Sequence, residues 1–185
     1  MTKYIKNLLK LTLIVGLFTA CGLTGETKIR LESSAKEVKD EINKIREEAV
    51  TEGVNFAAFT DKQTGSKVAE NPFIIKAKIR ATNVALKFVQ AIKEEAEKLK
   101  ESGGSSQFSA MYALMFDISE PIEKIGVKDM TKTVELAAKK NPSTTVEGIL
   151  EIAKKMEEKL QNVNRKNTTA LKNLEEKSAT AATTK

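Results

Sequence analysis

The sequence predicts an all-α protein, an up-and-down bundle of five helices with a long linker between the first two helices. Three observations lead to this class. Ala, Lys, Glu, Leu and Ile dominate the 185 residues, and this composition favours helix. The 3 prolines and 9 glycines are few and clustered, so they mark boundaries. Apolar residues recur at spacings of three and four, as on one face of a helix.

The N-terminal segment, residues 1–20, is predicted to be a lipoprotein signal peptide. Three lysines precede a short apolar run that ends in LFTACG at 17–22, which resembles a bacterial lipobox. Cys21 is then expected to be the lipidated first residue of the mature protein. This would place the domain at the cell surface, on the outer membrane, with membrane contact through the lipid anchor only. An ordinary secretory signal with a chance cysteine is the alternative.

A tether over 21–28 is predicted to lead into a first helix at about 29–52, which Gly53 ends. Its apolar seam consists of Leu31, Ala35, Val38, Ile42, Ile45 and Ala49. A linker without clear periodicity follows over 53–71, and we expect Phe56 and Phe59 to pin part of it to the core.

Asn71 and Pro72 predict the start of the second helix, with Asn as the cap and Pro at the first helical position. This helix is expected to run to about residue 101, with Ile75, Ile79, Leu86, Val89, Ile92, Ala96 and Leu99 turned inward. Glycines at 103 and 104 then separate it from a third helix over 106–119. Pro121 is expected to interrupt that third helix.

A shorter fourth helix is predicted over 128–139, before a break at Asn141 and Pro142. Thr144 and Glu147 have the spacing of a capping box for the last helix. Its apolar seam consists of Ile149, Ala153, Met156, Leu160 and Val163. The bundle is expected to span 29–175 and to end in a flexible tail over 176–185.

The residue types exclude several kinds of chemistry. The chain has one cysteine, Cys21, and no histidine, so an intramolecular disulfide and the usual zinc or copper sites are ruled out. Ser-His and Cys-His nucleophile pairs are absent for the same reason. The acids alternate with lysines on helix surfaces, which favours solvated ion pairs over a catalytic carboxylate pair. We therefore predict no cofactor, no metal and no enzymatic activity.

Positive charge is segregated along the chain. Residues 71–93 contain no acid but include Lys76, Lys78 and Arg80, and residues 159–174 contain no acid either. The second segment carries Lys159, Arg165, Lys166 and Lys172, and Lys155 lies on the same helix face. In an up-and-down bundle these two basic halves lie at the same end, together with the linker lysines Lys62 and Lys67.

This segregation is costly, because like charges at i,i+4 destabilise a helix by about 0.2–0.5 kcal/mol per pair. A basic face kept for solubility is one interpretation, and a binding site for a polyanion is the other. No aromatic residues are interleaved with the lysines, so a platform for stacking nucleic-acid bases is missing. A sulfated polysaccharide outside the cell fits an exported domain better than DNA or RNA. A surface that binds a host protein directly remains the alternative.

Seven segments of the chain resemble the decorin-binding protein A family, surface lipoprotein adhesins of Lyme disease spirochaetes. These segments are CGLTG (21–25), TKIRLE (27–32), GVNF (53–56), ENPFI (70–74), FSAMY (108–112), DMTKTV (129–134) and LEIAKKM (150–156). The resemblance implies a five-helix bundle that binds decorin, chiefly through its dermatan sulfate chain. It also implies binding of other glycosaminoglycans, including heparin-like chains, and attachment to the host extracellular matrix.

The resemblance further implies that Lys78, Lys159 and Lys166 are the essential lysines of a lysine-lined pocket. The basic linker of the family corresponds to the segment that carries Lys62 and Lys67. The remaining candidate residues for glycosaminoglycan binding come from the two acid-free halves and the neighbouring face: Lys76, Arg80, Lys155, Arg165 and Lys172.

Overall fold

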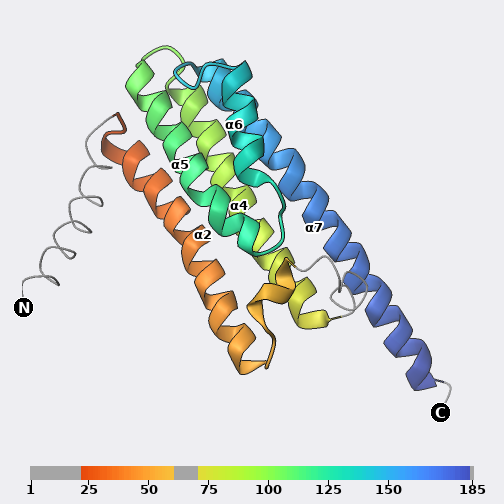
Figure 1. The fold of residues 1–185 in the computed structure, drawn as a ribbon. Coiled ribbons are helices and arrows are strands. Elements are labelled where there is room, and N and C mark those ends of the chain that lie inside the picture. The colour runs from red at the N-terminus through yellow and green to blue at the C-terminus, as the bar shows by residue number, and fades with distance from the viewer. Residues whose placement is uncertain (1–21, 61–70, 184–185) are drawn as a thin grey trace, which may run out of the picture.

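The computed structural model describes residues 22–60 and 71–183, which form five α-helices, one 3-10 helix and no strand. The elements are α2 (Gly25–Thr51), η1 (Phe56–Phe59), α4 (Pro72–Lys98), α5 (Ser105–Lys124), α6 (Met130–Lys140) and α7 (Val146–Thr183). Successive α-helices run in opposite directions along one bundle (Figure 1). The predicted all-α, up-and-down architecture is confirmed. Within the described residues, each helix is too short or too polar to span a bilayer.

The core forms where the apolar periodicity of the sequence predicts it. All six seam residues of α2 are buried, and so are Met130, Val134 and Ala137 of α6. Asn71 caps α4 as predicted, since its side-chain oxygen accepts hydrogen bonds from the amides of Phe73 and Ile74. These local signals and the burial pattern agree, which is why the bundle is well specified.

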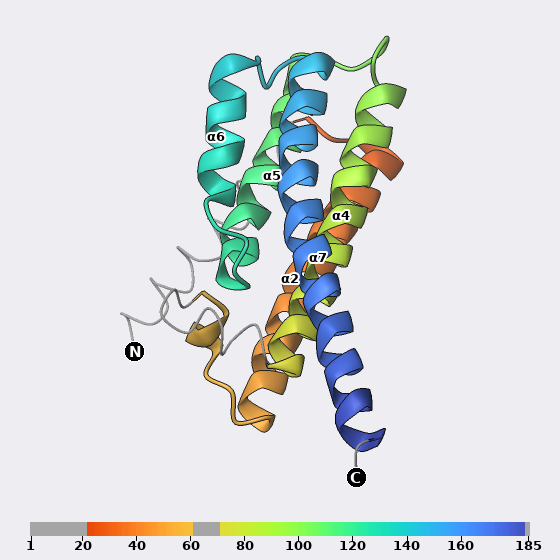
Figure 2. The same cartoon turned by 90° about the vertical axis from the view of Figure 1, so that its right-hand side faces the viewer.

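Helix α4 packs against α2, α5 and α7, and Figure 2 shows it running beside α7. It is therefore buried on several sides, and its alanines Ala77, Ala81 and Ala85 let neighbouring helices approach closely. The predicted single seam was only partly correct, because Ile79, Leu86 and Leu99 are half-buried. A helix that packs against several partners buries residues on several sides, so its sequence does not show one apolar stripe.

Several predicted boundaries shift. Helix α2 begins at Gly25, so residues 25–28 of the predicted tether are helical. Helix α5 continues through Pro121 to Lys124, because buried Ile118 and Ile122 hold the turn on both sides of the proline. Helix α7 continues to Thr183 through most of the predicted flexible tail, since no Gly or Pro follows Gly148.

The start of α7 also differs from the prediction. The amide of Gly148 donates a hydrogen bond to the hydroxyl oxygen of Thr145 at 3.1 Å, so Thr145 acts as the cap in place of Thr144. Both residues are threonines, and the sequence alone does not decide between two adjacent candidates for one cap position.

The short helix η1 is fixed to the bundle by aromatic contacts. The ring of Phe59 is 2% exposed and lies 5.0 Å from the ring of Phe56 and 6.3 Å from that of Phe73. The guanidinium of Arg46 lies over the Phe56 ring at 5.0 Å. The prediction that Phe56 and Phe59 pin the start of the linker is confirmed.

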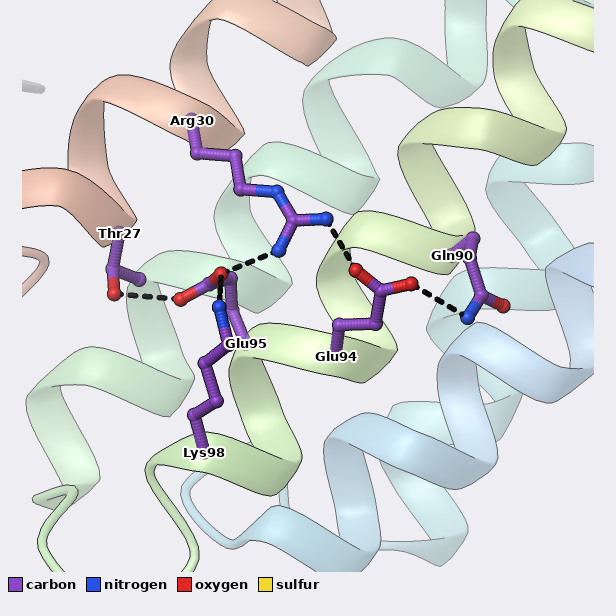
Figure 3. A network of polar contacts seen from close by, with 6 residues as sticks. All are labelled: Thr27, Arg30, Gln90, Glu94, Glu95 and Lys98. Carbon is purple, nitrogen blue, oxygen red and sulfur yellow. Dashed lines mark hydrogen bonds and ion pairs between the residues drawn. The ribbon is translucent and has the colours of Figure 1, made fainter.

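A buried carboxylate joins α2 to α4 near the start of α2 (Figure 3). Glu95 is 3% exposed, and it accepts hydrogen bonds from Thr27 at 2.7 Å, Arg30 at 2.6 Å and Lys98 at 2.8 Å. Burial opposes ionisation of Glu95, but the hydrogen bonds from Lys98, Thr27 and Arg30 outweigh it and lower its pKa to about 2. Arg30 also pairs with Glu94.

Candidate polyanion-binding site

The two acid-free halves of the chain lie side by side. The side-chain nitrogen of Asn164 on α7 donates to Thr82 Oγ1 and to Asn83 Oδ1 of α4, each at 2.8 Å. Helices α4 and α7 run antiparallel (Figure 1), so the first half of α4 is next to the second half of α7. The predicted convergence of these halves at one end is confirmed, and Asn164 sets the register in which their lysines meet.

Lys78 of α4 reaches the loop between α5 and α6. Gly126 in this loop has a φ of 92°, and a β-carbon there would lie 2.8 Å from Lys78 Nζ and 2.4 Å from the carbonyl oxygen of Phe59. Only glycine lets these three segments meet. Lys78 is half-buried, and both burial and repulsion by Lys128 lower the pKa of its ammonium group.

Lys159 of α7 reaches the other end of the same loop. Its ammonium donates hydrogen bonds to the main-chain oxygen of Asp129 and to Thr133 Oγ1, each at 2.9 Å. Burial lowers the pKa of Lys159, and the negative charges of Asp129 and Glu123 oppose this effect. An ammonium has three donors, so one remains for a ligand. Lys159 therefore holds the start of α6 and can also contact a ligand.

A third cation, Lys128, lies in this loop and is exposed. We call Lys78, Lys128 and Lys159 the loop lysines. Residues 126–129 span at most about 11 Å, so the two flanking ammonium groups border one small region. The three loop lysines make no ion pair with any carboxylate of residues 22–60 or 71–183. The sequence analysis missed Lys128, although its place directly after the Gly126 turn offered a signal.

The other predicted residues fall into two groups. Lys166 is exposed, and it lies seven residues after Lys159, which places it on the same face of α7 about 10 Å further along. Lys76 is exposed on the first turns of α4, and neither lysine pairs with a carboxylate in the described part of the chain. Lys62, Lys67 and Cys21 lie outside the described residues.

Four candidate cations have partners that reduce their availability to a ligand. The guanidinium of Arg80 turns toward α2 and pairs with Glu41 at 2.6 Å and Glu48 at 2.7 Å. The sequence did not predict the pairing of Arg80, because Glu41 and Glu48 belong to a different helix. Three more candidates interact within α7: Lys155 pairs with Glu158 and Glu151, Lys172 with Glu176, and Arg165 donates to Asn162.

The fold and the arrangement of charge define a class of protein, a helical-bundle binding protein in which cations without a carboxylate partner in residues 22–60 and 71–183 gather around one loop. Among the described residues, no group of three acids, cysteines or histidines is placed to hold a metal. Residues 26–185 match the family described as decorin binding protein. The chain belongs to this family, and within it to the decorin-binding protein A family.

Individual relatives agree with this assignment. Decorin-binding protein A of Borreliella burgdorferi is 62% identical over 173 residues, 94% of this chain and 91% of the relative. The structure of decorin binding protein A from strain N40 of Borrelia burgdorferi has a TM-score of 0.69 at 62% identity, covering 81% of this chain and 90% of that one. The corresponding structure from strain PBr of Borrelia garinii has a TM-score of 0.60 at 66% identity, covering 84% and 96%. These relatives are named for binding, in agreement with the non-enzymatic prediction.

Proposed function

We propose that this protein is an adhesin that binds decorin through the sulfated glycosaminoglycan chain, with dermatan sulfate and heparin-like chains as ligands. The loop lysines carry the proposal, because two helices and a loop far apart in the sequence bring together three ammonium groups that have no carboxylate partner among the described residues. The names of the relatives support decorin as the partner. Binding in this way attaches the cell to the host extracellular matrix.

The physical basis of this binding is electrostatic. Sulfate and carboxylate groups of the polysaccharide meet point charges on lysines, and the counterions condensed on the chain are released. Lys78 is held half-buried against Gly126, so a sulfate that contacts it offsets an existing desolvation penalty. Lys166 and Lys76 extend the positive charge along α7 and α4, and Lys62 and Lys67 of the linker complete the proposed set.

Binding to immobilised decorin tests the proposal. We expect affinity to fall steeply as NaCl rises, and to be lost after chondroitinase removes the glycan. Lys159→Ala should weaken binding at least about tenfold with unchanged helicity, since a hydrogen bond to a charged group contributes about 1.5–3 kcal/mol. Lys154→Ala is the matched control, because Lys154 is exposed on the same helix and pairs with Glu151. Binding that survives glycan removal would instead favour a direct contact with the decorin core protein.

We further propose that Cys21 carries the lipid that anchors the protein to the outer membrane. The lipobox-like sequence supports this proposal. The place where Gly22 joins the bundle is also compatible with an anchor at Cys21. A β-carbon on Gly22 would lie 2.0 Å from the main-chain oxygen of Ser106, so the chain enters the bundle against the start of α5. In Figure 1, α2 begins at the end of the bundle away from the start of α4, so an anchor there leaves the basic end facing outward.

Detergent partitioning tests the anchor. The wild-type protein expressed in the native cell should partition into the Triton X-114 phase, because each buried acyl CH₂ contributes about 0.8 kcal/mol. Cys21→Ala should move the protein into the aqueous phase, and Ala20→Ser should leave it in the detergent phase. A wild-type protein found in the aqueous phase would refute lipidation.

A further inference from the structure

The outer face of α6 carries positive charge that the loop lysines do not account for. Lys132, Lys139 and Lys140 are exposed, and none forms an ion pair with a carboxylate in the described ranges. Glu135, the acid of this helix, influences Tyr112 of α5, where it contributes to a raised pKa behind the larger effect of burial. Three exposed lysines and one exposed glutamate leave the solvent-facing side of α6 with a net positive charge.

These lysines continue the site already described. Met130, Val134 and Ala137 are buried in the core, and Thr133 faces α7 because it accepts a hydrogen bond from Lys159. Lys132 and Lys139 are seven residues apart and lie on the opposite, outer side, about 10 Å from one another. Lys132 lies in the first turn of α6, four residues after Lys128 in the preceding loop. Exposed lysines without a carboxylate partner in the described residues thus continue from the loop lysines along α6, with Glu135 as the one acid among them.

Several lysines elsewhere on the surface are paired with acids. On α2, Lys28, Lys36 and Lys39 all pair with nearby acids, and Lys124 of α5 pairs with Glu120. Others, such as Lys44 of α2 and Lys87 of α4, are exposed without a carboxylate partner in the described residues, so pairing varies over the surface. What distinguishes the lysines of α6 is that they adjoin the loop lysines, so that one anionic chain can contact both groups.

We infer that the outer face of α6 is a second subsite for the polysaccharide chain, which crosses the loop lysines and continues over Lys132 and Lys139. This inference rests on the proposed function. Charge complementarity and continuity with the loop lysines identify the occupant as a long sulfated polysaccharide. An anionic membrane fits less well, because Leu136 is the exposed large apolar residue of α6 and an interfacial helix needs a broad apolar face.

The test compares a Lys132→Gln, Lys139→Gln double variant with the wild-type protein, on full-length dermatan sulfate and on a dermatan sulfate hexasaccharide. Each lost cation should reduce the slope of log affinity against log salt by about 0.7–0.9, so the slope for the full-length chain should fall by roughly 1.5. The affinity for the hexasaccharide should be unchanged. A Lys36→Gln, Lys44→Gln double variant of α2 makes the same charge change at exposed positions and should leave both slopes unchanged.

Each contrary outcome is distinguishable. An unchanged slope for the α6 variant, when Lys78→Met does lose binding, overturns the second subsite and leaves the proposed function intact. If Lys78→Met also binds normally, the proposed site itself fails. An equal loss on the hexasaccharide would make α6 part of the first subsite and overturn the extension. Binding to phosphatidylglycerol vesicles that the α6 variant abolishes would assign the face to a membrane and overturn the polysaccharide.

Discussion

Replacing Lys78 with methionine is expected to stabilise the fold and to weaken binding of dermatan sulfate at the same time. Folding half-buries the Lys78 ammonium and places it against the positive charge of Lys128, which lowers its pKa. A lysine with a lowered pKa destabilises the folded state. The penalty is complete below the folded pKa and shrinks as the pH rises toward 10.5, the ordinary value. Methionine keeps the length of the side chain and removes the charge.

The expected gain in the free energy of unfolding at pH 7 is about 0.5–2 kcal/mol, which raises the melting temperature by roughly 1–8 °C. The expected loss of affinity is roughly 10- to 150-fold, the equivalent of one charged hydrogen bond. Thermal melting by circular dichroism and calorimetric titration with dermatan sulfate measure the two effects. The stability gain should diminish at pH 10, because the wild-type lysine then loses its charge.

Lys87→Met is the matched control, since Lys87 is exposed on the same helix and half-way along it. It should leave both the melting temperature and the affinity nearly unchanged. A destabilised Lys78→Met protein would contradict the stated cost of burying this ammonium. Unchanged affinity would show that the loop lysines do not contact the polysaccharide.

Removing the Glu95 carboxylate is expected to produce the largest loss of stability. The pKa of Glu95 falls from 4.5 to about 2 on folding, which corresponds to about 3 kcal/mol at pH 7. Because the folded pKa is lowered, this stabilisation is complete above pH 4.5 and is lost as the pH falls toward 2. Glu95→Gln should therefore melt roughly 6–12 °C below the wild-type protein at pH 7, and the difference should vanish near pH 2.

Glu94→Gln provides the control, because Glu94 binds the same Arg30 but is exposed. It should change the melting temperature far less than Glu95→Gln. Lys78 and Glu95 are 17 residues apart on α4, about 26 Å along the helix, so affinity for dermatan sulfate should not change while the protein is folded. A Glu95→Gln protein whose stability relative to wild type is independent of pH would refute the charged state assigned to this carboxylate.

The buried charges at the two ends of α4 have opposite effects on stability. At its carboxyl end, Glu95 is buried with three donors that satisfy it. At its amino end, Lys78 is half-buried without a carboxylate among the described residues. A site that binds polyanions needs unsatisfied positive charge, and the bundle tolerates it because other contacts stabilise the fold.

Local sequence signals predicted much of the fold. The six seam residues of α2 and the Asn71 cap were predicted correctly, because each depends on residues within a few positions of one another. The acid-free halves were also visible in the sequence, and antiparallel packing alone placed them together. Helix boundaries were predicted less accurately. The continuation of α5 through Pro121, for example, depends on core contacts with other helices.

The composition and periodicity of the sequence by themselves determined an all-helical bundle with two basic segments at one end. Only the tertiary structure decided which of those cations remain unpaired. Arg80 is matched by acids of α2, whereas Lys78, Lys128 and Lys159 meet at one loop without a carboxylate partner in the described residues. The physical reason is that charge pairing depends on distances of about 4 Å between side chains, and between helices these distances are set by packing rather than by separation along the chain.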